Sequence, residues 1–124
     1  MSNIIHRNES YKIIGVLFEV YNNLGSGFSE IVYKDAIEYE LKKLGISFER
    51  EKEYKVIYKD IILPHKFYAD FVVFDKIILE IKCVENFHNN HIAQCINYLK
   101  VSKCKLGILA NFKKSSLEYK RIVF

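Results

Sequence analysis

The sequence is short of the residues that small proteins use as covalent or metal-bound staples. It has only three cysteines, Cys83, Cys95 and Cys104, and no two of them have the C-x-x-C spacing of a structural zinc site. The odd number also argues against a disulfide framework, so we expect reduced, buried thiols. The four histidines lack H-E-x-x-H or comparable ligand spacing. The fold is therefore expected to depend on its apolar core.

No apolar run is long enough to cross a bilayer, and residues 1–11 are polar and lack the apolar segment of a secretory signal. We therefore expect a cytoplasmic protein with no membrane partner. Repeats, low-complexity tracts and linkers are absent too. With 124 residues, half of them hydrophobic, the chain is predicted to form a single domain over residues 1–124. Its net charge of +4 is compatible with a polyanionic partner without establishing one.

The hydrophobic pattern predicts two helices, three strands, a third helix and two final strands. Gly25 is expected to close the first helix, and Ser29 is expected to be the N-cap of the second, with Phe28 and Tyr33 forming a hydrophobic staple. The order α-α-β-β-β-α-β-β predicts an α/β (α+β) fold with helices packed on a mixed sheet. The predicted helices cover residues 10–24, 29–44 and 90–101, and the predicted strands cover residues 47–58, 66–74, 77–83, 105–111 and 117–124.

Two acidic residues stand inside strands that are otherwise typical of a core. Asp70 lies in the segment FYADFVVF, and Glu80 lies in IILEIK, where it shares a face with Lys82 because side chains alternate along a strand. A carboxylate in a core strand needs a partner or a metal, because burying an isolated charge is costly. An ion pair of either carboxylate with Lys82 would be the structural explanation, and a metal site would be the functional one. Burial alone does not separate them.

The length of the turn between these two strands decides whether the carboxylates meet. A two-residue turn at 75–76 would place them on opposite faces of the sheet. A three-residue loop at 75–77 would pair Asp70 with Lys82 and bring all three charged groups to one face. We predict this odd-length loop, or a bulge with the same effect.

Two carboxylates and an ammonium group in this arrangement suit hydrolysis of a phosphodiester. Carboxylate oxygens hold Mg²⁺ or Mn²⁺ and leave positions for water and a phosphate oxygen. The metal lowers the pKa of the bound water and neutralises charge on the phosphate. Lys82 could orient the water or stabilise the developing charge.

These residues also resemble a known signature. Asp70 followed by Glu80-Ile81-Lys82 resembles the PD-(D/E)XK nuclease motif, with alanine in place of the proline. Residues 27–33 fit G-x-x-E-x-x-Y, and Gln94 and Tyr98 fit a Q-x-x-x-Y element found in one branch of these nucleases. From about residue 11 to residue 124, the chain resembles the GxxExxY family, small bacterial and archaeal proteins assigned to the PD-(D/E)XK superfamily.

The resemblance implies a restriction-endonuclease-like core and a catalytic set. In that set Asp70 and Glu80 bind the metal, with the backbone carbonyl of Ile81 as a third ligand. Glu30 completes the acidic cluster, and Lys82 assists the reaction. Glu30 also has a structural explanation, because an acid in the first turn of a helix is favoured by the macrodipole.

Four further residues are predicted to support the site or bind substrate. Tyr33 closes the G-x-x-E-x-x-Y element. His91, Gln94 and Tyr98 are spaced to share one side of the third helix, which we expect to be distinct from its core stripe. This side would hold a substrate phosphate or orient the E-x-K residues. The alternative is a solvated helix face.

The expected function is therefore Mg²⁺-dependent cleavage of phosphodiester bonds, in DNA rather than RNA. With little chain outside the core, cutting is expected to be structure-directed or weakly sequence-specific. A homodimer would pair two sites across a duplex. The alternatives are a non-catalytic nucleic-acid-binding domain and a protein-interaction domain on the same fold. Lysines cluster at 100–105 and 113–121, where they could follow a phosphate backbone or form an ordinary solvated surface.

Overall fold

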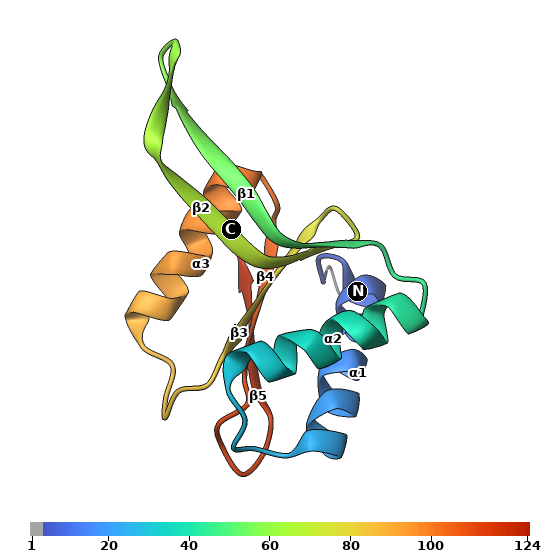
Figure 1. The fold of residues 1–124 in the computed structure, drawn as a ribbon. Helices are drawn as coiled ribbons and strands as arrows, with labels where there is room; N and C mark the ends of the chain where they lie inside the picture. The colour runs from blue at the N-terminus through green and yellow to red at the C-terminus, as the bar shows by residue number, and fades with distance from the viewer. Residues whose placement is uncertain (1–3) are drawn as a thin grey trace.

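The sheet of this protein carries helices on both of its faces, as the computed structural model of residues 4–124 shows (Figure 1). The first three residues of the predicted domain lie outside the described part. The observed order is the predicted one and confirms the mixed fold. The elements are α1 (Arg7–Leu24), α2 (Glu30–Lys43), β1 (Phe48–Tyr58), β2 (Ile61–Val73), β3 (Ile77–Lys82), α3 (Asn89–Ser102), β4 (Leu106–Asn111) and β5 (Glu118–Val123).

The residues between α1 and α2 determine where the first helix ends and the second begins. Gly25 closes α1 as expected and has a positive φ of 66°, but its ψ of −165° differs from the left-handed helical conformation that such a glycine was expected to adopt. Ser29 has the extended conformation of an N-cap, but its side chain makes no capping hydrogen bond. The rings of Phe28 and Tyr33 meet edge to face with their centroids 6.2 Å apart, which confirms the staple. No helix within residues 4–124 is both long and apolar enough to cross a membrane.

The five strands follow chain order across the sheet, β1-β2-β3-β4-β5. Only β3 and β4 are parallel, and α3 connects them. One core cluster, which includes Phe71, Leu79 and Ile81, packs against α1 and α2. The other, which includes Ala69 and Ile78, packs against α3. The acidic residues of β2 and β3 thus lie in strands that are covered on both faces.

The β1–β2 hairpin forms an arm that projects beyond the helices (Figure 1). Its second strand begins at Ile61, whereas the sequence predicted a start at residue 66. The chain reverses between Tyr58 and Ile61, where Lys59 adopts a left-handed conformation with φ 56° that allows a tight turn. Pairing therefore continues almost to the tip, where Ile57 faces Ile62.

The loop between β2 and β3 has the predicted odd length but lies one residue earlier. It spans residues 74–76, so that Val73 pairs with Ile77. Ile77 is fully buried and therefore belongs to strand β3 rather than to the loop. Phe74 is only half-buried and adopts a loop conformation with a φ of 58°. The predicted loop at 75–77 is wrong in position for this reason.

This register changes which residues face each other across the two strands. Continued from the pair Phe71–Leu79, it sets Asp70 opposite Glu80. The predicted pairing of Asp70 with Lys82 is therefore wrong by two residues. A shift of two keeps the same parity, so Glu80 and Lys82 remain on the face that the odd loop was expected to select.

The three thiols are free, as expected, but only Cys95 is buried. Cys83 and Cys104 are half-buried, which corrects the expectation that all three lie in the core.

Candidate functional site

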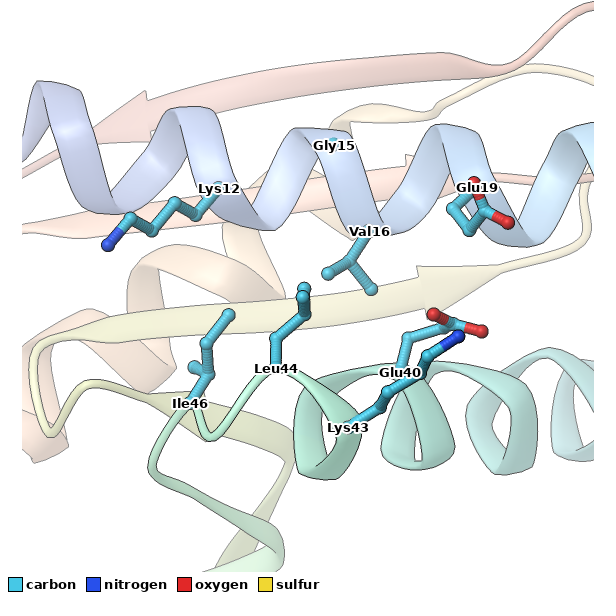
Figure 2. Close-up of a pocket in the computed structure, with 8 residues that line it drawn as sticks. All are labelled: Lys12, Gly15, Val16, Glu19, Glu40, Lys43, Leu44 and Ile46. Carbon is cyan, nitrogen blue, oxygen red and sulfur yellow. The ribbon is translucent and has the colours of Figure 1, made fainter.

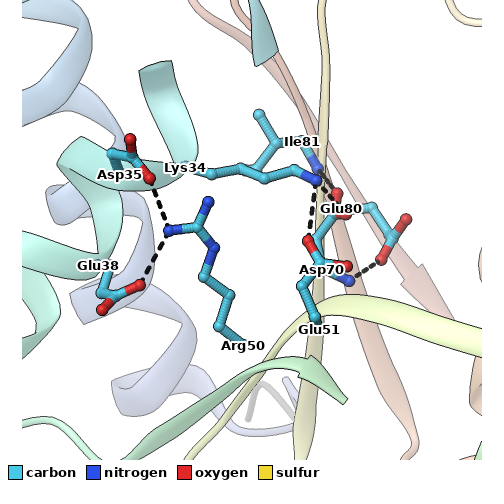
Figure 3. Close-up of polar contacts among 8 residues, drawn as sticks. All are labelled: Lys34, Asp35, Glu38, Arg50, Glu51, Asp70, Glu80 and Ile81. Carbon is cyan, nitrogen blue, oxygen red and sulfur yellow. Dashed lines mark hydrogen bonds and ion pairs between the residues drawn. The ribbon is translucent and has the colours of Figure 1, made fainter. Parts of the chain in front are cut away.

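Strands β2 and β3 separate at the acidic residues. There, hydrogen bonds from backbone N–H groups to carboxylates replace the backbone-to-backbone hydrogen bonds of the sheet. Regular pairing ends at Phe71 and Leu79. Beyond it, the backbone N–H of Asp70 donates to Glu80 Oε2 at 2.7 Å, and the N–H of Ile81 donates to Asp70 Oδ2 at 2.8 Å (Figure 3). Each carboxylate thus satisfies a backbone donor of the neighbouring strand.

A break in the alternation of β2 turns Asp70 toward this gap. Ala69 packs in the α3 cluster and Phe71 packs in the α1–α2 cluster, although residues two apart in a strand normally share a face. The partner strand is also irregular here, because Glu51 has φ 54°. As a result the Asp70 carboxylate lies between the strands rather than in either core.

Glu80 carries the most perturbed carboxyl group of the site. Its side chain is almost fully buried, with 2 % of the residue exposed. Burial, followed by the negative charge of Asp70, raises the pKa of Glu80 to about 8, and the Asp70 N–H and the positive charges of Lys82 and Lys34 offset part of this rise. Two carboxylates held this close together are a site that gains from a cation.

Lys34 supplies a cation that the sequence analysis missed. Its Nζ lies 2.8 Å from Asp70 Oδ1 and 3.2 Å from Glu51 Oε1 (Figure 3). Burial lowers the pKa of Lys34, but its hydrogen bonds and charge contacts with Asp70 and Glu51 outweigh this and raise it. The ion pair is not sealed, because the side chains of Lys34 and Asp70 are 14 % and 12 % exposed. Its position one helical turn after Glu30 is the signal that could have identified it.

Glu30 and Lys82 lie at the carboxyl end of β3. Glu30 Oε2 accepts a hydrogen bond from the backbone N–H of Cys83 at 3.1 Å. Lys82 Nζ donates to Gln94 Oε1 of α3 at 3.2 Å. Helix α2 and helix α3 therefore each fix one polar group beside this strand end, and Gln94 holds the lysine of the E-x-K element.

The side chain of Tyr33 holds together the loop that precedes α2 and contains the first part of the G-x-x-E-x-x-Y element. Its hydroxyl donates to Gly25 O at 2.6 Å and accepts from the N–H of Phe28 at 3.2 Å, while its buried ring stacks on Phe112 with centroids 4.4 Å apart. Gly27 between them has φ 111°, which a side chain would strain. These contacts fix the loop before α2 and so set the position of Glu30 in its first turn.

The predicted polar side of α3 exists only in part. Gln94 is exposed, but Tyr98 is 6 % exposed and packs in the α3 cluster, with its ring 5.8 Å from that of Phe67. The prediction that Tyr98 lies apart from the core stripe is wrong, because the arm extends over that side of the helix. His91 accepts a hydrogen bond at Nδ1 from the N–H of His88 at 3.0 Å, and burial and Lys82 lower its pKa. It helps to cap the helix.

A buried asparagine, also missed, holds the chain that follows Lys82. Asn111 is fully buried at the end of β4, opposite Lys82 in the ladder. Its side chain accepts from the N–H of Val84 at 3.0 Å and donates to Val84 O at 2.7 Å. Like Asp70, it is a buried polar residue in an otherwise apolar strand, and the same burial argument could have singled it out.

The donor set fits a divalent cation only with help from the backbone and solvent. Within residues 4–124, no three His, Cys, Asp or Glu side chains lie close enough together to hold a metal. Glu30 therefore does not join Asp70 and Glu80 in a single acidic cluster. Two carboxylates remain, and Asp70 Oδ1 already contacts a positive charge. Hard oxygen donors with this shortage of protein ligands are typical of Mg²⁺, which keeps several waters.

A comparison with protein families agrees with the fold and with the pair of carboxylates on β2 and β3. A profile of the PD-(D/E)XK nuclease superfamily matches residues 7–122, and the chain belongs to this superfamily. Among proteins with curated functions, none matches the sequence.

Two solved structures share the fold. The crystal structure of SSO0001 superposes with a TM-score of 0.61 at 21 % identity, over 74 % of this chain and 48 % of that one. An alkaline exonuclease from Laribacter hongkongensis superposes with a TM-score of 0.55 at 11 % identity, over 99 % of this chain and 72 % of that one. The chain thus spans about half the length of the first structure.

Proposed function

We propose that this protein is a nuclease that hydrolyses phosphodiester bonds with a divalent cation, Mg²⁺ or Mn²⁺, and that its substrate is DNA. The observation that carries the proposal is the gap between β2 and β3, where Asp70 and Glu80 lie side by side with Lys82 following on the same strand. Membership of the superfamily supports the reaction class.

Asp70, Glu80 and the backbone carbonyl of Ile81 would hold the cation. When bound, the ion supplies an acidified water and neutralises charge on the phosphate. Lys34 would give up its contact with Asp70 where the cation is held, and Glu51 would remain its partner. Glu30 lies one turn from Lys34, at the end of β3, where it would orient water beside the cation.

Lys82 is proposed to act on the reacting phosphate. Its ammonium group has three donors, and Gln94 accepts one of them. The other donors remain to orient the attacking water and to stabilise charge that develops on phosphorus-bound oxygens. Gln94 is thus a positioning residue for Lys82.

The G-x-x-E-x-x-Y element supports placing the chain in the GxxExxY group of the superfamily. Within residues 4–124, the segments that connect the helices and strands are short loops. We therefore propose structure-directed or weakly sequence-specific cutting, for which junctions, strand ends and nicked DNA are the candidates.

The test is cleavage of supercoiled, linear, single-stranded and junction DNA in Mg²⁺, Mn²⁺ and Ca²⁺ by the purified protein. Asp70→Ala and Lys82→Ala should each lower the cleavage rate at least about a hundredfold, as expected for loss of a metal ligand or of a group that stabilises the transition state. Lys42→Ala serves as the control, because Lys42 is exposed at the far end of α2.

Each result supports a different function. Cutting that both site variants abolish and Lys42→Ala retains supports the nuclease. Salt-sensitive DNA binding without cutting supports a non-catalytic nucleic-acid-binding domain. Absence of both would contradict any role on nucleic acid and favour a protein-interaction domain.

A further inference from the structure

Positive charge is concentrated on the β1–β2 arm and the end of α3. Residues 52–68 and 97–105 contain seven lysines and two acidic residues, a net charge of +5. The whole chain carries only +4, so the remaining residues together carry −1. Charges of one sign gathered in this way repel one another, and an anionic partner relieves the repulsion. The lysines are Lys52, Lys55, Lys59, Lys66, Lys100, Lys103 and Lys105.

Three of these lysines line a groove between the arm and α3. Lys55, Lys100 and Lys103 are exposed around a floor that includes Phe67 and Val101. Lys55 also faces Lys66 across the β1–β2 ladder, and the single carboxylate of Glu53 lies 3.8 Å from both ammonium groups, so the three side chains together keep one net positive charge. Within residues 4–124, no ion pair neutralises Lys100 or Lys103.

Helix α3 links this groove to the candidate site. Gln94, which contacts Lys82, lies six residues before Lys100 and nine before Lys103. These separations correspond to about 9 and 14 Å along the helix axis. Asn97, which lies between Gln94 and Lys100 on the helix, is also exposed to solvent. Phosphates of one strand of B-DNA follow one another at about 3.4 Å along the duplex axis, so for a duplex that runs along α3 the groove lies roughly three to four base pairs from the site.

We propose that this arm–α3 groove binds the phosphate backbone of a DNA duplex whose reacting phosphate lies at the candidate site, an inference that rests on the proposed function. The groove supplies sequence-independent affinity and sets the direction in which the duplex leaves the site. It lengthens the footprint of a small domain along α3.

DNA is favoured over a protein partner by the charge around the tip of the arm. The tip exposes large apolar side chains, which alone would also suit a protein surface: Ile57, Tyr58, Ile61 and Ile62. However, Lys55, Lys59 and Lys66 flank them, with the Lys59 Nζ 5.5 Å from the centre of the Tyr58 ring. A two-stranded ribbon with lysines beside apolar groups suits a DNA groove, where phosphates border the bases.

A second groove, between α1 and α2, has a different charge and provides the control (Figure 2). It is lined by Lys12 and Lys43 together with Glu19 and Glu40, so its lysines and acids balance. Lysines here are exposed to solvent like those of the arm–α3 groove. Removal of Lys12 and Lys43 together with the exposed Lys42, which lies outside this groove, takes away three positive charges, as many as the arm–α3 variant loses, but at a different place.

The test is DNA binding measured by fluorescence anisotropy with a labelled 30-base-pair duplex, in EDTA, at several salt concentrations. The triple variant Lys55→Gln, Lys100→Gln, Lys103→Gln should lose at least about tenfold in affinity and should lower the salt slope by about 2 to 3. The control triple Lys12→Gln, Lys42→Gln, Lys43→Gln should stay within about twofold of the wild type. Circular dichroism of both variants shows that they fold.

The outcomes separate this proposal from the proposed function. An equal loss in the two triple variants would mean that only net charge matters, and would overturn the groove. A dimer that the arm triple dissociates, with DNA affinity unchanged, would assign the groove to a second copy. Groove-dependent binding by a protein that cuts no DNA in Mg²⁺ would retain the groove while the nuclease proposal fails. No binding by the wild type in EDTA would overturn the groove, and cutting in Mg²⁺ by the same protein would then retain the nuclease proposal without it.

Discussion

The carboxylate of Asp70 is shared between a backbone N–H on one strand and an ammonium group on a helix. The positive charge of Lys34, together with that of Lys82, offsets the repulsion between Asp70 and Glu80. A lysine at this position stabilises the protein and opposes any other cation that approaches the same oxygen. These two effects can be measured separately.

Lys34→Met should raise the affinity for Mg²⁺ by about tenfold, a change of about 1.4 kcal/mol. The ammonium group no longer competes for Asp70, and its repulsion of the incoming ion is gone. In EDTA the same variant should be less stable by about 2 kcal/mol, since a partly buried carboxylate loses its partner. Isothermal titration and thermal unfolding check the two changes. Lys42→Met, which breaks an exposed pair with Glu38, should alter neither.

Glu80→Gln should stabilise the protein in EDTA by about 1–3 kcal/mol at pH 8. The pKa of Glu80 is raised above its unfolded value, so the buried charge costs nothing below about pH 4.5 and its full cost is reached above about pH 8. The gain on substitution should therefore grow across that range. Urea unfolding at pH 5 and pH 8 measures it. The exposed Glu85→Gln provides the comparison, and a gain that does not depend on pH would contradict the burial argument.

For single residues, the sequence was enough to predict the acidic pair Asp70 and Glu80, but not the ion-pair partner Lys34. Charged residues in apolar strands identified Asp70 and Glu80, because burial makes such residues expensive. Lys34 lies on an amphipathic helix, where a lysine is ordinary, so its spacing from Glu30 could suggest it but only the tertiary contact assigns it to Asp70. Tyr98 was misplaced because helical periodicity does not show that the arm covers that side of α3.

Among the elements, α3 is the one held most closely to the sheet. Gly107 of β4 lies beneath it, and a Cβ at this position would meet Cys95 Sγ at 2.4 Å and Leu99 at 3.6 Å. The glycine permits a close approach of helix and strand. Because Gln94 and the groove lysines are on α3, its distance from the sheet positions both proposed surfaces.

Gly107→Ala should destabilise the protein by about 1–3 kcal/mol, since a buried sulfur or a whole helix must move to admit one methyl group. DNA affinity should fall with it if the arm–α3 groove is displaced. Thermal unfolding gives the first quantity and anisotropy the second. Gly15→Ala is the matched control: Gly15 is an exposed position of α1 with nothing near its Cβ, so alanine should stabilise the helix by about 0.5–1 kcal/mol.

The elements themselves were predictable to within a few residues, with one informative exception. Periodicity located every helix and strand, and the need to bring two carboxylates together predicted the parity of the 74–76 loop. The loop position was not predictable, because it depends on the burial of Ile77 against β4, a contact between segments far apart in the chain. The length of the arm was missed because Pro64 and polar neighbours interrupt its pattern.

For the whole molecule, a central sheet shared by two core clusters predicts cooperative unfolding. Strands β2, β3 and β4 contribute side chains to both clusters, so neither layer of helices can separate without exposing the other side of the same strands. Urea unfolding followed by far-ultraviolet circular dichroism and by tyrosine fluorescence should give coincident midpoints. An earlier transition in one signal would contradict the prediction of one domain.

The hydrogen bonds that fix the start of α2 show that part of the G-x-x-E-x-x-Y motif has a structural role. The glycine and the tyrosine of G-x-x-E-x-x-Y serve the folding of one corner, through Gly27 and the Tyr33 hydroxyl. A chain could keep those letters after losing its chemistry, as long as it keeps that corner. Among relatives, therefore, the tyrosine would mark shared architecture, and the aspartate with the E-x-K residues would be the better guide to whether an enzyme is still at work.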